Sequence, residues 1–266
     1  LHKTQIERNQ IMLQLSKVQN HFMRYLQVGG FPELALADND IMAQQIMRED
    51  VVDKVLKRDL PSLYNIRNAT ELERIFLYLC NVSSEIVSIE AITKELNGVS
   101  RVTVENYIQF LESANLIYQS WPIDMAGKKV LKARPKIYIA DAAIRNAVLM
   151  DDTILMNPEG MGKVVETAVY KHVCAFYYQR ATSVGYFRGG KKNKEIDIVV
   201  DYPNIKNIII EVKYRDSAPI SDDDAIVELC EESSVAIVVT KSEMDFGVHD
   251  TRCGRKLLRI PAFAFL

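Results

Sequence analysis

Charged side chains of both signs stand within two of the most apolar segments of the chain, EIDIVVD and IIIEVKY. Asp197 lies in the first segment, and Glu211 and Lys213 lie in the second. Side chains alternate along a strand, so Glu211 and Lys213 share one face if IIIEVKY is a strand. If the two segments pair, Asp197 and Glu211 can approach one divalent cation. Such carboxylates favour Mg²⁺ or Mn²⁺, which polarises a phosphate and helps to deprotonate a water.

Glu166 adds a fourth group to this constellation. It belongs to the amphipathic segment KVVETAVYKHVCAFYY, which is expected to form a helix just before the strands. The apolar face of that helix is expected to bury Val165, Val169, Val173 and Phe176. Lys213 would orient the attacking water or neutralise the charge of the transition state. We therefore predict a catalytic group of Glu166, Asp197, Glu211 and Lys213, with the three carboxylates as metal ligands.

A structural interpretation of the same residues stays open. NIIIEVKY and EIDIVVD are nearly continuous apolar runs, which indicates strands covered on both faces. A charge buried there is costly unless it is paired or bound to a metal. A salt bridge of Lys213 with Glu211 or Asp197 would satisfy that requirement as well as a cation would.

The glycine-rich segment GYFRGGKK, which begins at Gly185, partly matches the phosphate-binding loop of ATPases. Lys192 stands where that loop needs Ser or Thr, and the following residues NKEIDIVV are typical of a strand rather than a helix. We therefore predict a β-hairpin tip and no ATP site in this chain. Lys191 and Lys192 remain candidates for contact with a phosphate backbone.

The elements that must position these residues form an α/β domain over residues 155–266. Strands are expected at about 184–188, 195–201 and 207–214, followed by a helix over 222–232 and the strand VAIVVT. Residues 1–66 are expected to be a helical segment, because apolar residues recur every three or four positions. The fold class is thus mixed, with an all-α segment first and an α/β domain last.

Residues 67–141 have the layout of a winged helix-turn-helix domain, with ELERIFLYLCNVS, SIEAITKELN and SRVTVENYIQFLESANL as helices. Ser88 and Ser100 are expected to cap the second and third helices. Val102, Val104, Tyr107, Ile108 and Leu111 are expected to face the core. Residues available to nucleic acid are Arg101, Thr103 and Asn106 on the third helix, and Lys128, Lys129, Lys132 and Arg134 in the wing. Glu105 and Glu112 on the same helix leave a protein-contact role open.

Composition narrows the class of protein. The chain has 266 residues and a formal net charge of -2, which argues against a protein that coats nucleic acid along its whole length. No apolar run is long enough to span a membrane, and no signal peptide is evident. The four cysteines are scattered, which fits neither a zinc cage nor a disulfide framework. We expect a cytoplasmic protein with no membrane partner, and oligomer formation stays open.

Several segments together resemble a known family. These are YLQVGGFPEL, DLPSLYNIRN, SRVTVENYIQFLESANLIY and PKIYIAD, followed by VVETAVYKHV, EIDIVV and IIIEVKY. The chain, from about Tyr25 to Pro261, resembles the C-terminal half of prokaryotic AAA-type ATPases that carry domain of unknown function 4143. The resemblance implies a winged helix followed by a PD-(D/E)xK, restriction-endonuclease-like domain. It also implies an ATPase domain upstream of Leu1, and it puts Glu195 on an additional acidic position of that family.

Two functions follow as hypotheses. In the first, the chain is a DNA-interacting module of a larger ATPase, and its C-terminal domain cleaves or grips DNA with Mg²⁺ or Mn²⁺. In the second, both domains are a non-enzymatic scaffold for protein interaction or for regulation of the ATPase. Fold alone does not decide between them.

Overall fold

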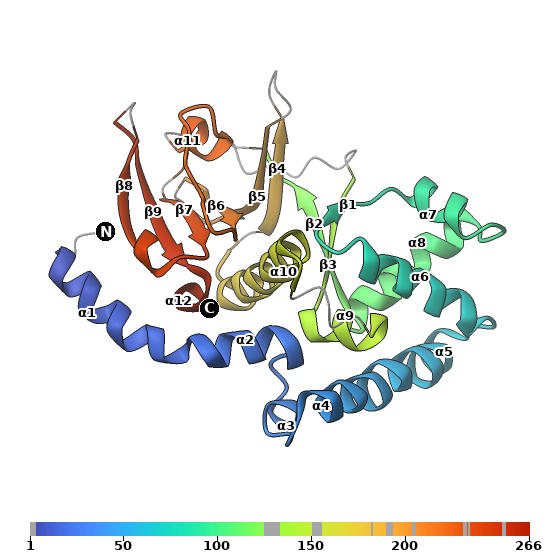
Figure 1. Cartoon of the computed structure of the whole chain (residues 1–266). Coiled ribbons are helices and arrows are strands. Elements are labelled where there is room, and N and C mark those ends of the chain that lie inside the picture. The colour runs from blue at the N-terminus through green and yellow to red at the C-terminus, as the bar shows by residue number, and fades with distance from the viewer. Residues whose placement is uncertain are drawn as a thin grey trace. The chain divides into compact units, whose positions relative to one another are not determined.

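The fold is described from a computed structural model that covers residues 4–124, 134–150, 156–181, 183–189, 194–203, 206–230, 233, 235–251 and 254–266. The chain divides into two compact units (Figure 1). Unit 1 comprises Leu1–Phe22, Ser120–Ala133 and Asn157–Leu266, and unit 2 comprises Met23–Gln119 and Arg134–Met156. Among the described residues, no helix combines the length and the apolar character needed to cross a membrane.

Unit 2 is mainly helical, as the apolar periodicity of its sequence predicts. The elements up to residue 64 are α2 (Gln19–Val28), α3 (Pro32–Ala35), α4 (Asp40–Ile46), η2 (Met47–Asp53), η3 (Val55–Asp59) and α5 (Leu60–Tyr64). Helix α2 starts in unit 1, and η2 and η3 are π-helices. The later elements are α6 (Ala69–Asn81), β1 (Glu85–Ile86), α7 (Ile89–Glu95), α8 (Arg101–Ser113), β2 (Ile117–Pro122), β3 (Lys136–Ile139) and α9 (Ala142–Leu149). Strand β2 passes into unit 1 after Gln119.

The two predicted serine caps of unit 2 are confirmed. The Ser88 hydroxyl accepts a hydrogen bond from the Ala91 amide, and the Ser100 hydroxyl accepts one from the Thr103 amide. Each bond satisfies an amide that the first turn of a helix leaves without a partner. The sequence therefore located the starts of α7 and α8 correctly.

Asp141 joins two segments of unit 2 that are far apart in sequence. Its Oδ1 accepts from the Ala143 amide at 2.9 Å and caps α9, while its Oδ2 accepts from the Gly30 amide at 3.3 Å. Gly29, with φ +82°, lies so close that an added Cβ would come within 2.8 Å of Asp141 Oδ1. The GGFPE turn and the end of PKIYIAD are therefore held together by one carboxylate that is almost fully buried.

Unit 1 is built on a mixed sheet. Its strands are the end of β2, β4 (Ser183–Gly189), β5 (Lys194–Asp201), β6 (Ile208–Lys213), β7 (Val235–Thr240), β8 (Gly247–Asp250) and β9 (Lys256–Pro261). Its helices are α1 (Gln5–Leu15), η1 (Ser16–Val18), α10 (Pro158–Tyr177), α11 (Ala225–Leu229), η5 (Glu243–Asp245) and α12 (Ala262–Phe265). β4–β5, β5–β6 and β8–β9 are antiparallel, whereas β2–β4, β6–β7 and β7–β9 are parallel.

Helices cover both faces of the central strands of unit 1, as the apolar runs predict. Ile209 packs in one core cluster with Ile226 and Val227 of α11. Its neighbour Ile210 instead lines a pocket with Val173 of α10. Because adjacent strand residues point to opposite faces, α11 and α10 cover opposite sides of β6.

The sequence analysis predicted some details of the fold wrongly and missed some elements. The helix expected over 222–232 is shorter, at Ala225–Leu229, while α9 and β8 were not anticipated. Val102 was expected in the core but is 64% exposed, and Phe176 is 62% exposed. Both sit at apolar-periodic positions on helices whose other predicted core residues are buried, so periodicity alone overestimated the width of the buried stripe.

Gly185 shows why the phosphate-loop match is misleading. It lies inside β4, which pairs in parallel with β2, and an added Cβ would come within 2.1 Å of the Trp121 carbonyl oxygen. A glycine is thus required by the close approach of two backbones. Gly190, Lys191 and Lys192 lie outside the described residues.

Candidate functional site

Strands β5 and β6 pair as the nuclease hypothesis requires. Ile198 faces Ile210 and Val200 faces Ile208 in the antiparallel ladder, and Asp197 comes directly before this paired stretch. On the other side, the β4–β5 register passes from Gly185–Val199 to Phe187–Ile196, which gives β5 one extra residue. A bulge of this kind redirects side chains and is common beside active sites. Asp197 therefore lies where the strand geometry is irregular.

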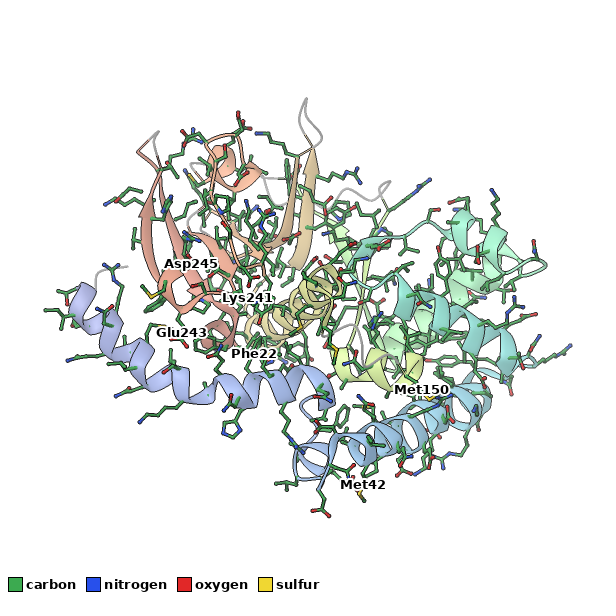
Figure 2. The ribbon with its side chains drawn as sticks, in the orientation of Figure 1. Phe22, Met42, Met150, Lys241, Glu243 and Asp245 are labelled. Atoms are coloured by element: carbon green, nitrogen blue, oxygen red, sulfur yellow. The ribbon has the colours of Figure 1, made fainter. Side chains whose placement is uncertain are left out.

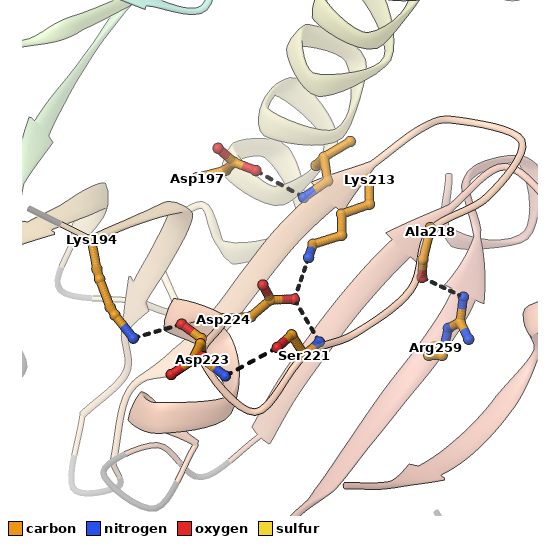
Figure 3. Close-up of polar contacts among 9 residues, drawn as sticks. Lys194, Asp197, Lys213, Ala218, Ser221, Asp223, Asp224 and Arg259 are labelled. Carbon is orange, nitrogen blue, oxygen red and sulfur yellow. Dashed lines mark hydrogen bonds and ion pairs between the residues drawn. The ribbon is translucent and has the colours of Figure 1, made fainter. Parts of the chain in front are cut away.

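The Asp197 carboxylate reaches across to β6 (Figure 3). Its Oδ2 accepts a hydrogen bond from the Val212 amide at 2.8 Å. Val212 is the residue between Glu211 and Lys213, so the three predicted residues are brought to one part of the sheet. All three side chains are half-buried, which raises the cost of leaving their charges uncompensated.

Lys213 has a partner that the sequence analysis did not identify. Its Nζ donates to Asp224 Oδ2 at 2.5 Å, and the Ser221 amide donates to the same oxygen at 3.1 Å (Figure 3). The two side chains are only 11% and 27% exposed. Asp224 immediately precedes α11. A lysine within an apolar strand needs a counter-charge. That requirement is the feature of the sequence that could have indicated an acidic partner for Lys213.

The pKa of Asp224 reflects this environment. Burial by itself would raise the pKa of the carboxyl group. The hydrogen bonds from Lys213 and Ser221, and the positive charges of Lys213 and Arg215, together outweigh burial and lower it. Asp224 therefore stays ionised as the counter-ion of Lys213 at neutral pH.

A second lysine fixes the same segment to β5. Lys194 Nζ donates to the Asp223 carbonyl oxygen at 2.6 Å and forms an ion pair with Glu228 of α11. Its side chain is 15% exposed. The start of α11 is therefore held to the sheet by lysines from two neighbouring strands.

The segment between β6 and α11 is held by two further cations. Arg259 of β9 donates to the Ala218 carbonyl oxygen at 3.1 Å (Figure 3). It also pairs with Asp245 at 2.7 Å. Lys241, which directly follows β7, pairs with Asp216 at 2.5 Å. Lys241 and Asp245 are labelled in Figure 2, on the segment that follows β7. These contacts give the segment after β6 a defined course beside Lys213.

Glu166 lies half-buried on α10, and α10 contacts both β4 and β6. Within the part of the chain that is described, no three His, Cys, Asp or Glu side chains are grouped closely enough to hold a metal ion. The structure thus brings Asp197 beside the backbone of Glu211 and Lys213, but it does not assemble the three-carboxylate set. Mg²⁺ is commonly held by one or two carboxylates completed by waters and phosphates. Asp197 and Glu211 supply two carboxylates on neighbouring strands, the number that this lower requirement names.

The predicted nucleic-acid helix has a different character. Arg101 pairs with Glu90 and with Glu105, each at 2.8 Å, and these contacts, led by the Glu105 hydrogen bond, raise the pKa of the guanidinium. Thr103 Oγ1 is hydrogen-bonded to Ser100 Oγ at 2.8 Å, while Asn106 is exposed. Arg134 is exposed, and the other wing candidates, Lys128, Lys129 and Lys132, lie outside the described residues.

Comparison with known proteins finds relatives without assigned functions. Uncharacterized protein MJ1544 of Methanocaldococcus jannaschii is 26% identical over 206 residues, which cover 76% of this chain and 43% of that protein. An uncharacterized protein of Haemophilus influenzae is 25% identical over 128 residues, covering 47% of this chain and 32% of its own length. The chain thus spans less than half the length of these curated relatives. No solved structure matches the chain.

Two families of unknown function match consecutive parts of the chain. Residues 161–263, which include Glu166, Asp197, Glu211 and Lys213, match the domain of unknown function DUF4143. The expected resemblance to that family is confirmed there, but residues 19–154 match a separate description, the domain of unknown function DUF8612. The match to DUF8612 covers half of the chain. The chain therefore belongs to the DUF8612 family and carries a DUF4143 region after it.

Proposed function

We propose that unit 1 is a nuclease-like module that binds the phosphate backbone of DNA through a divalent cation at Asp197 and Glu211. The observation that carries this proposal is the Asp197–Val212 hydrogen bond, which places a carboxylate beside Glu211 and Lys213 at an irregular point of the sheet. Charges in strands covered on both faces are expensive, so their grouping favours a site. In this proposal the strands form a PD-(D/E)xK, restriction-endonuclease-like fold.

The residues of the chain have distinct roles in this proposal. The Val212 amide fixes the orientation of Asp197 by donating to its Oδ2. Asp224 holds the Lys213 side chain in place, and a phosphate oxygen would replace Asp224 as its partner. Mg²⁺ or Mn²⁺, when bound, supplies charge neutralisation at the phosphate and an activated water. Glu166 would join the site only if α10 or its side chain shifts toward β5.

The rest of the protein has a supporting role in the same proposal. Helices α6, α7 and α8, with β2 and β3, act as a winged helix-turn-helix that contacts DNA through Thr103 and Asn106. An AAA-type ATPase domain in a longer protein would supply ATP hydrolysis in this proposal. Within this chain, the match to the phosphate loop at Gly185 is explained by strand packing.

Binding of Mn²⁺ to the purified chain, measured by isothermal titration calorimetry, tests the site. Asp197→Asn and Glu211→Gln are each expected to weaken Mn²⁺ binding about tenfold or more, as loss of one of two charged ligands implies. Asparagine at 197 can still accept the Val212 amide, so the fold is preserved. Asp216→Asn is the matched control, since Asp216 is 88% exposed and pairs with Lys241. Equal Mn²⁺ affinity in all four proteins would exclude the site.

A scaffold function is the second candidate, and one observation favours it. Two of the cations proposed to contact nucleic acid already form ion pairs within the protein. Lys213 pairs with Asp224, and Arg101 pairs with Glu90 and Glu105. A duplex and a single-stranded oligonucleotide titrated at low salt, with and without Mn²⁺, separate the two functions. Binding that weakens steeply with salt supports the nucleic-acid module. Absence of binding to either strand form supports the scaffold.

A further inference from the structure

A group of aromatic side chains surrounds the C-terminal end of α10. We define the α10 aromatic patch as Phe176, Tyr177, Tyr178, Tyr202 and Arg180, all within unit 1. Phe176 is 62% exposed and Tyr178 is 74% exposed. Single exposed apolar residues are ordinary on protein surfaces, but contiguous ones mark interaction sites.

The rings of the patch hold one another in defined orientations. The Phe176 and Tyr177 centroids are 5.0 Å apart with planes at 79°, and those of Tyr177 and Tyr202 are 6.0 Å apart with planes at 80°. These edge-to-face contacts are the arrangement that aromatic pairs prefer. Because the rings are already ordered, a ligand that stacks on them loses less side-chain entropy on binding.

The backbone after α10 places a cation on the same patch. Gln179 has a φ of +63°, and this left-handed residue lets the chain turn back. The Arg180 and Ala181 amides both donate to the Tyr177 carbonyl oxygen, at 2.8 and 3.0 Å. The Arg180 guanidinium consequently lies 4.9 Å from the centroid of the Phe176 ring. A left-handed glutamine is uncommon, so the turn has a conformational cost that this contact partly offsets.

An apolar cavity of about 240 Å³ adjoins the patch. Phe176 and Tyr177 form part of its wall, and Ile210 and Ile237 of the sheet form another part. The patch thus combines two exposed aromatic residues, a guanidinium that lies over one of their rings, and a neighbouring apolar recess. None of its five residues is acidic, so nothing within it repels a phosphate.

We propose that the α10 aromatic patch stacks the unpaired bases of single-stranded nucleic acid, while Arg180 binds an adjacent phosphate. Every base offers a π face to an aromatic ring, and bases also stack on guanidinium planes. In a duplex those faces are covered by neighbouring base pairs, so the patch selects single strands. This inference deepens the proposed function, because it specifies the form of nucleic acid that unit 1 receives.

The test is fluorescence anisotropy with a labelled oligothymidylate, in EDTA, so that no divalent cation contributes. Phe176→Leu keeps an apolar side chain but removes the ring, and it is expected to weaken binding about fivefold or more, the lower range for loss of one base–aromatic stack. Phe176→Trp is expected to restore binding. Arg180→Gln is expected to lower the slope of log affinity against log salt by about 0.7. Met244→Ala, a truncation at a 93% exposed position of unit 1, is the control and should bind as the wild type does.

Three results would overturn the inference. Phe176→Leu could bind oligothymidylate as tightly as the wild type, or could lose duplex binding to the same degree. The wild type could also fail to bind oligothymidylate at low salt, in which case the patch is a protein contact. Two variants distinguish this inference from the proposed metal site. Asp197→Asn should retain oligothymidylate binding in EDTA, and Phe176→Leu should retain Mn²⁺ affinity in calorimetry.

Discussion

The two units place their charged side chains in different environments. Unit 2 carries ion pairs along exposed helix surfaces, such as Lys57–Asp53 and Arg101–Glu105, in which each side chain is 35–64% exposed. In unit 1, Lys213 and Asp224 are 11% and 27% exposed and lie beside strands that helices cover on both faces. Water screens the first kind of pair and leaves it nearly neutral for stability, whereas the second kind must be satisfied inside the protein.

This difference teaches where to look for function. A helix can turn its charges to solvent at little cost, so the charges on α8 are explained without any ligand. A strand covered on both faces has no such freedom, and a lysine retained there needs a specific partner. The charged side chains near Asp197 therefore indicate a functional site more strongly than the exposed charged side chains of unit 2 do.

The largest expected effects come from the cores, where both units should respond alike. Ile209 and Leu111 are fully buried, and Ile209→Ala or Leu111→Ala should each lower the free energy of unfolding by about 2–5 kcal/mol. Urea unfolding followed by circular dichroism measures this loss. A much smaller loss in one unit would show that its core is loosely packed. The ion pairs of the two units could then not be compared as pairs beside equally well-packed cores.

Breaking the Lys213–Asp224 pair should have the next largest effect. Lys213→Met keeps the length of the side chain but leaves Asp224 without its counter-ion. The expected loss at neutral pH is about 1–3 kcal/mol, between the values for exposed and fully buried pairs. Urea midpoints of the variant and the wild type give the difference, and Lys241→Met, at an exposed pair, is the control. Equal losses in both variants would contradict the importance of burial.

The pH dependence of that loss has a definite sign. The pKa of Asp224 is lowered in the folded protein, so the pair contributes stability above the ordinary value of 3.8 and loses it as the pH falls through the folded value. The difference between the wild type and Lys213→Met should therefore shrink as the pH falls from neutral to below 3.8. Urea unfolding across that range measures it. A difference that stays constant would mean that Asp224 is not the group responsible.

Removal of a helix cap in unit 2 should have a moderate effect. Ser100→Ala removes the hydroxyl that accepts from the Thr103 amide, and the expected loss is about 1 kcal/mol. Ser100→Gly should cost less, because glycine is tolerated at this position. The thermal midpoints of the two variants distinguish them. If both substitutions are neutral, the cap seen at α8 does not contribute to stability.

The smallest effect should come from the exposed pairs of unit 2. Arg101→Gln removes both contacts of a side chain that is 64% exposed, so the urea midpoint should stay close to that of the wild type. Nucleic-acid affinity gives a sharper readout. If Arg101 is held by Glu90 and Glu105, Glu90→Gln with Glu105→Gln should strengthen duplex binding, and Arg101→Gln should not weaken it much.

The sequence predicted the strands well and the helix boundaries less well. Strands β4, β5 and β6 agree with the predicted ranges within one or two residues, because alternating or continuous apolar runs bounded by polar turns define them. The helix after Asp222 is only five residues long. Before it, the Asp224 carboxylate pairs with Lys213, and the Asp223 carbonyl oxygen accepts a hydrogen bond from Lys194. Tertiary contacts therefore occupy part of the range in which the sequence predicted a helix.

By itself, the sequence determined that two apolar strands carry Asp197, Glu211 and Lys213, and that serine caps begin α7 and α8. These are local properties, since side-chain alternation and capping depend on residues only a few positions apart. Only the tertiary structure decided that Asp197 bonds the Val212 amide and that Asp224 is the partner of Lys213. It also decided that Phe176 is exposed beside Arg180. Strand register, a bulge and the return of the chain after β6 set the contacts of Asp197 and Lys213, whereas the turn at Gln179 sets the contact of Phe176 with Arg180.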